Sequence, residues 1–180
     1  MTANRRLTLR AMLGAAAAAT GLGKARNIHA AALKAPPLAG DEDFMRLAIA
    51  EAARGDFPFG AVIVSGQKVL ASGRNLGKTL NDPTAHAEMV AIRRFLSEYP
   101  AGDLKDATLY ASGEPCPMCM GAILWCGIGR VVFAASIDEL SAKIGQIMMT
   151  SETLARAAPF SSVTITGGVL SSESLALFSE

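Results

Sequence analysis

Three short apolar segments, separated by segments of helical pattern, limit the fold of this chain more than any other feature. They are residues 60–64, 108–111 and 131–134, and a helix is predicted over residues 117–126, between the last two. A single crossover helix brings two consecutive strands side by side in the same direction, so we expect these two strands to be parallel. Strands that alternate with helices form a sheet covered on both faces. The predicted fold class is therefore α/β.

Further signals divide the rest of the chain into elements. Residues 60–72 predict a β-hairpin, because two runs of strand-forming residues flank a Ser-Gly turn at 65–66. Asp41 and Asp82 are expected to cap two helices, with Pro83 in the first helical position of the second. The expected elements are helices over residues 41–52, 83–99, 117–126 and 152–158, a strand over 163–166 and a closing helix from 172.

Two motifs, each at a predicted helix start, combine residue types that bind metals. They are His-Ala-Glu at residues 86–88 and Pro-Cys-Pro-Met-Cys at residues 115–119. The amide groups and dipole at a helix start favour negative charge, so Cys116 and Cys119 are well placed to ionise. Two thiolates and the neutral imidazole of His86 suit Zn²⁺. Three protein ligands leave the fourth tetrahedral position for water or hydroxide, which is typical of a catalytic site.

The cysteine pair also has a second interpretation, because Cys-x-x-Cys in an exported protein is often a disulfide. The order H-x-E followed by P-C-x-x-C, however, is the signature of zinc-dependent deaminases. Zinc lowers the pKa of a bound water from about 15.7 to about 7, and a carboxylate beside the metal then carries a proton to the leaving amine. Glu88 is the residue expected to carry this proton.

Residues 41–168 resemble the cytidine deaminase-like superfamily, and within it the branch of bacterial guanine deaminases and tRNA adenosine deaminases. The resemblance rests on three motifs, at residues 58–62, 81–88 and 114–119. It implies a three-layer α/β/α fold with a five-stranded mixed sheet, and assembly as a homodimer. It also implies a hydrolase that acts on C–N bonds in cyclic amidines.

The resemblance implies a free nucleobase as substrate, a purine such as guanine or a related amino-heterocycle, with release of ammonia. It places Phe59, Asn75, Trp125 and Ala87 at the substrate. A planar base held against aromatic rings, with one amide bonding its edge, is physically reasonable. Three of these residues also have a structural interpretation: Phe59 as core, Asn75 as a turn residue and Trp125 as a core residue of the predicted helix over residues 117–126.

Two departures from guanine deaminases leave the substrate open among purines, pyrimidines and triazine-like amines. Those enzymes carry an acidic residue shortly after the position of Gly145, where this chain has Gln-Ile-Met-Met at residues 146–149. They also close the pocket with an aromatic C-terminal segment, for which this chain has no clear counterpart in residues 178–180. The role of residues 142–160 in the pocket is not predicted.

Charge argues against nucleic acid as a partner. Five of the 17 basic residues precede residue 33, and the remaining basic and acidic residues give a net charge of −4. An acidic surface does not attract polyanions, so editing of adenosine in tRNA is the alternative rather than the first expectation. A non-catalytic module that binds zinc or a base is a further alternative.

The N-terminal residues predict export. Asn-Arg-Arg-Leu-Thr-Leu-Arg at residues 4–10 resembles a twin-arginine signal motif, and an apolar run rich in Ala and Gly follows it. We expect a signal over residues 1–32, a linker over 33–40 and the catalytic domain over 41–180. The apolar run is too short for a stable membrane span. A periplasmic location follows, or a cytoplasmic one if the segment is no signal.

Overall fold

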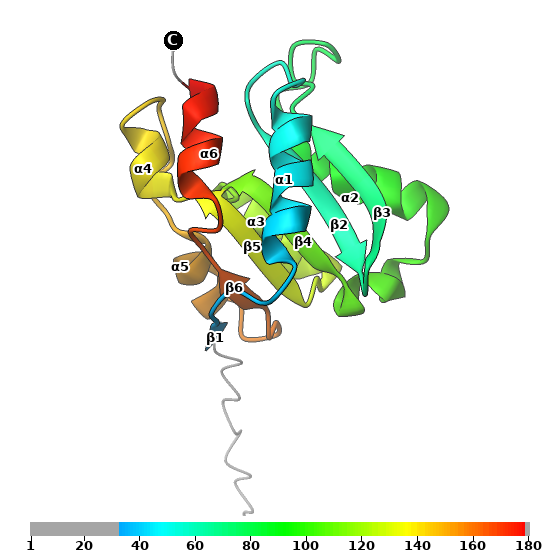
Figure 1. Cartoon of the computed structure of the whole chain (residues 1–180). Coiled ribbons are helices and arrows are strands. Elements are labelled where there is room, and N and C mark those ends of the chain that lie inside the picture. The colour runs from blue at the N-terminus through cyan, green and yellow to red at the C-terminus, as the bar shows by residue number, and fades with distance from the viewer. Residues whose placement is uncertain (1–32, 179–180) are drawn as a thin grey trace, which may run out of the picture.

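The computed structural model describes residues 33–178, so the predicted signal lies outside the described residues. Its centre is one six-stranded sheet with the order β1-β6-β5-β4-β2-β3 (Figure 1). The strands are β1 (Leu33–Lys34), β2 (Gly60–Ser65), β3 (Lys68–Arg74), β4 (Thr108–Gly113), β5 (Arg130–Ala135) and β6 (Thr164–Thr166).

The strand directions confirm the expected mixed sheet. Strand β2 is antiparallel to β3 and to β4, as the hairpin signal predicted. Strands β4, β5, β6 and β1 are parallel to one another along the other half. Five of these strands correspond to the expected ones, and β1 is an addition. It comes from the segment predicted as a linker, where Leu33 pairs with Thr164 and Lys34 pairs with Ile165.

Helices cover both faces of the sheet and complete the predicted three layers (Figure 1). Helix α1 packs on one face, with α6 beside it, while α2, α3 and α5 pack on the other. The helices are α1 (Asp41–Ala52), α2 (Ala87–Glu98), α3 (Pro117–Cys126), α4 (Ile137–Ser141), α5 (Ser151–Arg156) and α6 (Ser171–Leu175), with 3₁₀ helices η1 (Ala101–Asp106) and η2 (Ala176–Phe178). Within residues 33–178, none of the helices has the length and apolar character that a bilayer crossing requires.

Successive strand residues alternate between two apolar cores. On β4, Leu109 and Ala111 contribute to the core under α2 and α3, whereas Tyr110 contributes to the core under α1. This is the two-residue period of a strand buried on both sides. The continuous apolar runs that predicted these strands therefore reflect a sheet between two helical layers.

Helix α2 begins four residues later than expected. Asp82 does not cap it: its carboxylate accepts hydrogen bonds from the backbone N–H of Thr84 at 2.8 Å and from the Thr84 hydroxyl at 2.6 Å. This local turn competes with helix formation, which is common for Asp. The helix starts at Ala87, and His86 takes the N-cap position with extended backbone. The motif histidine therefore lies at the helix start itself.

Asp41 also has a different role from the one expected. Gly40 is the N-cap of α1, and the Asp41 carboxylate is buried against β4 and β5. It accepts hydrogen bonds from both terminal nitrogens of Arg130 at 2.7 Å, from the Tyr110 hydroxyl at 2.9 Å and from the Leu38 amide at 2.7 Å. Burial opposes ionisation, but these hydrogen bonds outweigh it and lower the pKa of Asp41 below 3.8.

The C-terminal elements lie close to their expected positions: α5, β6 and α6 each begin within one residue of the prediction. Two elements were not anticipated, η1 and α4. Helix α4 begins with a capping box, in which the Ser136 hydroxyl and the Glu139 side chain bond each other's backbone amides. That Ser-x-x-Glu pattern is a helix-start signal that the sequence carries.

Candidate active site

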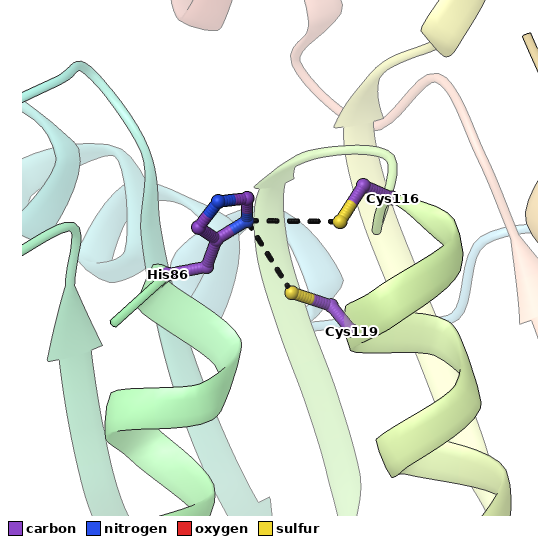
Figure 2. A group of neighbouring side chains, drawn as sticks. All are labelled: His86, Cys116 and Cys119. Carbon is purple, nitrogen blue, oxygen red and sulfur yellow. Dashed lines mark hydrogen bonds between the residues drawn. The ribbon is translucent and has the colours of Figure 1, made fainter. Parts of the chain in front are cut away.

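Three side chains from two helix starts converge on one point (Figure 2). His86 is the N-cap of α2, Cys116 is the N-cap of α3, and Cys119 lies in the first turn of α3. The Nδ1 atom of His86 is 3.6 Å from each of the two Sγ atoms. All three potential ligand atoms lie within 4.8 Å of one another.

This geometry fits a zinc ion. Tetrahedral zinc with Zn–S bonds of about 2.3 Å and Zn–N bonds of about 2.05 Å separates nitrogen and sulfur ligands by about 3.6 Å. The observed separations have this value. All three cysteines of the chain lie within the described residues and are free, so the alternative of a disulfide between Cys116 and Cys119 is not found. Two sulfur donors and one imidazole nitrogen suit zinc better than a hard cation such as Mg²⁺.

The two thiols differ in their ionisation. A hydrogen bond from Cys119 lowers the pKa of Cys116 to about 4, and the neighbouring His86 acts in the same direction. The same hydrogen bond, together with burial, raises the pKa of Cys119. The hydrogen bond to Cys116 also raises the pKa of His86, against the effect of burial. The negative charge therefore lies on the Cys116 thiolate at the N-cap of α3, where the helix dipole stabilises an anion.

Glu88 lies two residues after His86, in the first turn of α2, and is 7% exposed. Burial raises the pKa of its carboxyl group above 4.5. A raised pKa brings a carboxyl closer to the pH at which it both accepts and releases protons, which suits general acid–base chemistry.

A cavity of about 260 Å³ joins these residues to three other parts of the fold. One side carries the motif residues, a second comes from the ends of β2 and β3, and a third comes from the segment that follows α4. The lining residues are Phe57, Phe59, Asn75, His86, Glu88, Glu114, Cys116, Ile144, Gly145, Gln146 and Ile147.

Two of the expected substrate contacts line this cavity. The Phe59 ring packs edge-on against Phe178 with centroids 5.3 Å apart, and it lies where Gly113 has no side chain. A Cβ atom on Gly113 would approach the Phe59 ring to 2.8 Å. Asn75 is 6% exposed, and its Oδ1 accepts a hydrogen bond from the Gly77 amide at 3.1 Å, which fixes the orientation of its amide group.

The other two expected contacts lie elsewhere in the chain. Ala87 is buried in the core under α2 and does not line the cavity. Trp125 is 79% exposed and stacks on Phe160, with ring centroids 4.7 Å apart, outside the cavity. A single chain therefore brings Phe59 and Asn75 together with Glu88, but not Ala87 or Trp125.

Several lining residues had no role in the sequence-based expectations. Glu114 belongs to the motif at residues 114–119 but was not assigned a function, and Phe57 was not singled out. Residues 144–147 fall in the segment whose contribution to the pocket was not predicted. A Ser-x-x-Glu signal at residues 136–139 and a second cap at Thr150 would have located the two helices that bound this segment.

Comparison with known proteins places the chain among deaminases. Residues 39–135 match the family "cytidine and deoxycytidylate deaminase zinc-binding region". The guanine deaminase of Bacillus subtilis is 41% identical over 135 residues, which cover 69% of this chain and 86% of that protein. The tRNA-specific adenosine deaminase of Haemophilus influenzae is 43% identical over 110 residues, covering 58% of this chain and 63% of that protein.

Solved structures agree with these sequence relatives. The guanine deaminase of Nitrosomonas europaea superposes with a TM-score of 0.68 at 27% identity, over 78% of this chain and 84% of that one. A structure of the protein NE0047 in complex with 8-azaguanine gives a TM-score of 0.69 at 27% identity, with the same coverage. The family match covers more than half of the chain and includes all three potential ligands. The chain is thus a member of the cytidine and deoxycytidylate deaminase family, zinc-binding hydrolases that act on C–N bonds.

Proposed function

We propose that this protein deaminates a free nucleobase, with guanine and closely related amino-purines as the first candidates, and releases ammonia. The observation that carries the proposal is the small cavity in which Glu88, Phe59 and Asn75 meet the His/Cys/Cys group. Its volume of about 260 Å³ is of the order of a single planar base rather than a polymer. The similarity to guanine deaminases, over most of their length, supports the same substrate class.

Different residues of this chain carry out the metal binding and the proton transfer of the proposed reaction. His86, Cys116 and Cys119 would hold the zinc ion, which would supply Lewis-acid activation of a water molecule. The Glu88 carboxylate accepts a proton from the attacking water and passes it to the exocyclic amine nitrogen of the base. Protonation turns the amine into ammonia, a good leaving group. Because Glu88 is buried, bulk water does not compete for this proton.

Phe59 and Asn75 are the proposed substrate contacts from the same chain. The Phe59 ring offers an apolar face against which a base packs, and Phe178 supports it from behind. The Asn75 amide, held by Gly77, bonds polar atoms on the edge of the base. A contact from Ala87 would come from its backbone, since its side chain is buried in the core.

We also propose that the protein is a homodimer. An exposed apolar patch on the outside of α3 includes Trp125 and Phe160, and it is bordered by Pro117 and Leu154. Patches of large apolar residues mark interaction surfaces. Any contact between Trp125 and a base would be made in the cavity of a second copy. Light scattering of the wild type and of Trp125→Asp tests this: a change from dimer to monomer supports it, and a monomeric wild type refutes it.

Adenosine in tRNA is the second candidate substrate. One observation favours it: an open groove of about 510 Å³ continues from the site past Phe57, Asn75 and Lys78. Such a groove leaves room for more than one base. The net negative charge of residues 33–180 argues against tRNA as the substrate, since binding of a polyanion depends on basic side chains.

Ammonia release by the zinc-loaded protein separates these candidates. The panel contains guanine, 2,6-diaminopurine, adenine, cytosine, their nucleosides, an amino-triazine and an anticodon stem-loop, with Glu88→Gln as the blank. Release from free bases supports the proposal. Release from the stem-loop alone refutes it in favour of tRNA editing. No release from any of them, with zinc bound, indicates a non-catalytic binding module.

For residues 1–32 we propose a twin-arginine signal that directs the catalytic domain, residues 41–180, to the periplasm. The paired Arg5 and Arg6 carry this proposal. Cell fractionation tests it with the double substitution Arg5→Lys, Arg6→Lys. Retention of the variant in the cytoplasm, with export of the wild type, supports the proposal, and equal fractionation refutes it.

A further inference from the structure

Glu114 lies between the loop that carries the cysteines and the segment that forms one wall of the active-site cavity. We call residues 142–150, which connect α4 to α5, the cavity wall. Glu114 is 7% exposed, and it lines the cavity together with residues 144–147 of the wall. Its backbone continues directly into Pro115 and Cys116.

The two carboxylate oxygens of Glu114 bond the first residues of α4 and α5, the helices on either side of the cavity wall. Oε2 accepts a hydrogen bond at 2.9 Å from the amide of Ile137, the first residue of α4. Oε1 accepts one at 2.7 Å from the amide of Ser151, the first residue of α5. The Ser151 hydroxyl bonds the Pro115 carbonyl oxygen at 3.3 Å, and the Glu114 amide bonds the Ala135 carbonyl oxygen at 2.7 Å. One side chain therefore joins α4, α5 and the cysteine loop.

The cavity wall has few other means of keeping its position. Helix α4 has five residues and α5 has six, which is too short for a helix to be stable without tertiary contacts. Three consecutive apolar residues of the wall are largely exposed: Ile147 by 65%, Met148 by 60% and Met149 by 41%. A second cavity, of about 430 Å³, borders Glu114, Ser136 and Thr150, so packing does not fill the space beside the hydrogen bonds of Glu114.

We infer that Glu114 is a positioning residue that clamps the cavity wall to the metal loop and so sets the shape of the substrate pocket. The clamp itself is a statement about structure, whereas its effect on substrate affinity rests on the proposed function. Within residues 33–178, the Glu114 carboxylate accepts hydrogen bonds from the Ile137 and Ser151 amides and bonds none of the three potential metal ligands. Its loss should therefore weaken binding of the base more than it slows the chemical step.

Two variants of the zinc-loaded full chain test the clamp. Glu114→Gln keeps the size of the side chain but replaces one acceptor oxygen with an N–H donor that faces a backbone N–H. Ser151→Pro removes the second donor at the first position of a helix, where proline is tolerated. Asp41→Asn is the matched control, because it also removes a buried carboxylate that accepts several hydrogen bonds, but one bound to Arg130 at the opposite end of β4 and β5.

Amide hydrogen exchange decides whether the clamp exists, independently of activity. We expect exchange at Ile137 and across residues 144–149 to be about tenfold faster in both Glu114→Gln and Ser151→Pro than in the wild type, and unchanged in Asp41→Asn. Unchanged exchange in both clamp variants overturns the inference. If Glu114→Gln does not fold, Ser151→Pro alone decides.

Steady-state kinetics with guanine then test the consequence. We expect KM to rise about tenfold with kcat within about twofold and zinc content unchanged in the clamp variants. Asp41→Asn should lower the unfolding temperature without changing KM. A fall in kcat with KM unchanged, or loss of zinc, overturns the positioning role. If the wild type acts on another free base, the kinetics use that base. If it acts on no free base, the proposed function fails while hydrogen exchange still decides the clamp.

Discussion

The metal-binding residues and the cavity wall are two sides of one cavity, and they are built in different ways. The potential ligands lie at the starts of α2 and α3, helices of twelve and ten residues that pack on the larger of the two cores. The cavity wall lies between helices of five and six residues and carries exposed apolar side chains. The potential metal ligands are therefore anchored in the core, while the cavity wall depends on a few hydrogen bonds.

This contrast has a functional meaning. A ligand set must keep its distances to within a few tenths of an ångström, which only elements fixed by the core can provide. A cavity wall on a short connection can change in sequence and shape without disturbing the metal. The family relatives, which include both guanine and tRNA adenosine deaminases, are consistent with one fixed centre beside a variable wall.

Loss of the metal is expected to have the largest effect. Cys116→Ala or Cys119→Ala should abolish zinc binding and reduce ammonia release by more than about 10³-fold, because the remaining two ligands do not hold the ion. Chelation of the wild type should have the same effect, and added zinc should reverse it. Elemental analysis alongside activity provides the measurement. A cysteine variant that kept both zinc and turnover would contradict the assigned ligand set.

Substitution of Glu88, the proposed proton carrier, is expected to have the second-largest effect on activity. Glu88→Gln is expected to keep zinc and fold normally but to lower kcat by about 10³-fold, since general acid–base catalysis contributes roughly that factor. Zinc content and the unfolding temperature serve as controls. Nearly normal kcat in this variant would show that another group moves the proton.

Substitution of Asn75, a proposed substrate contact, is expected to have a smaller effect on activity. Asn75→Ala should raise KM about tenfold while zinc stays bound, because one buried hydrogen bond to the base is lost. The structural alternative predicts a different result, in which only stability falls because the bond to Gly77 is missing. Unchanged KM with a lower unfolding temperature would therefore support the structural role.

The smallest effect on catalysis is expected at Asp41, far from both sides of the cavity. Its pKa is lowered in the folded chain, so its contribution to stability is complete above its ordinary pKa of 3.8 and is lost as the pH falls through the folded value. Unfolding temperatures measured from about pH 6 to about pH 2 should fall steeply below about pH 4 in the wild type. In Asp41→Asn the unfolding temperature should be lower near neutral pH, with less additional loss in acid. A wild-type profile that is flat below pH 4 would contradict this.

Much of the fold could be predicted because local patterns and tertiary packing agree. The apolar runs that became β2, β4 and β5 are buried on both sides, so their composition alone marks them as strands. The start of α2 was misplaced because the Asp82 side chain bonds its own turn, and the same residue types favour caps and turns. Asp41 was taken for a cap because its partner Arg130 is 89 positions away in the sequence.

By itself, the sequence determined the ligand types, the spacing of both motifs and the position of each motif at a helix start. These features are local, and His86, Cys116, Cys119 and Glu88 could be named from them. Only the tertiary structure decided that the Nδ1 and Sγ atoms meet at zinc-ligand distances, that Trp125 lies outside the cavity and that Glu114 bonds the first residues of both α4 and α5. The reason is physical: each of these facts depends on the packing of helices around the sheet, which brings together side chains that lie 23 to 37 positions apart in the ligand and Glu114 contacts.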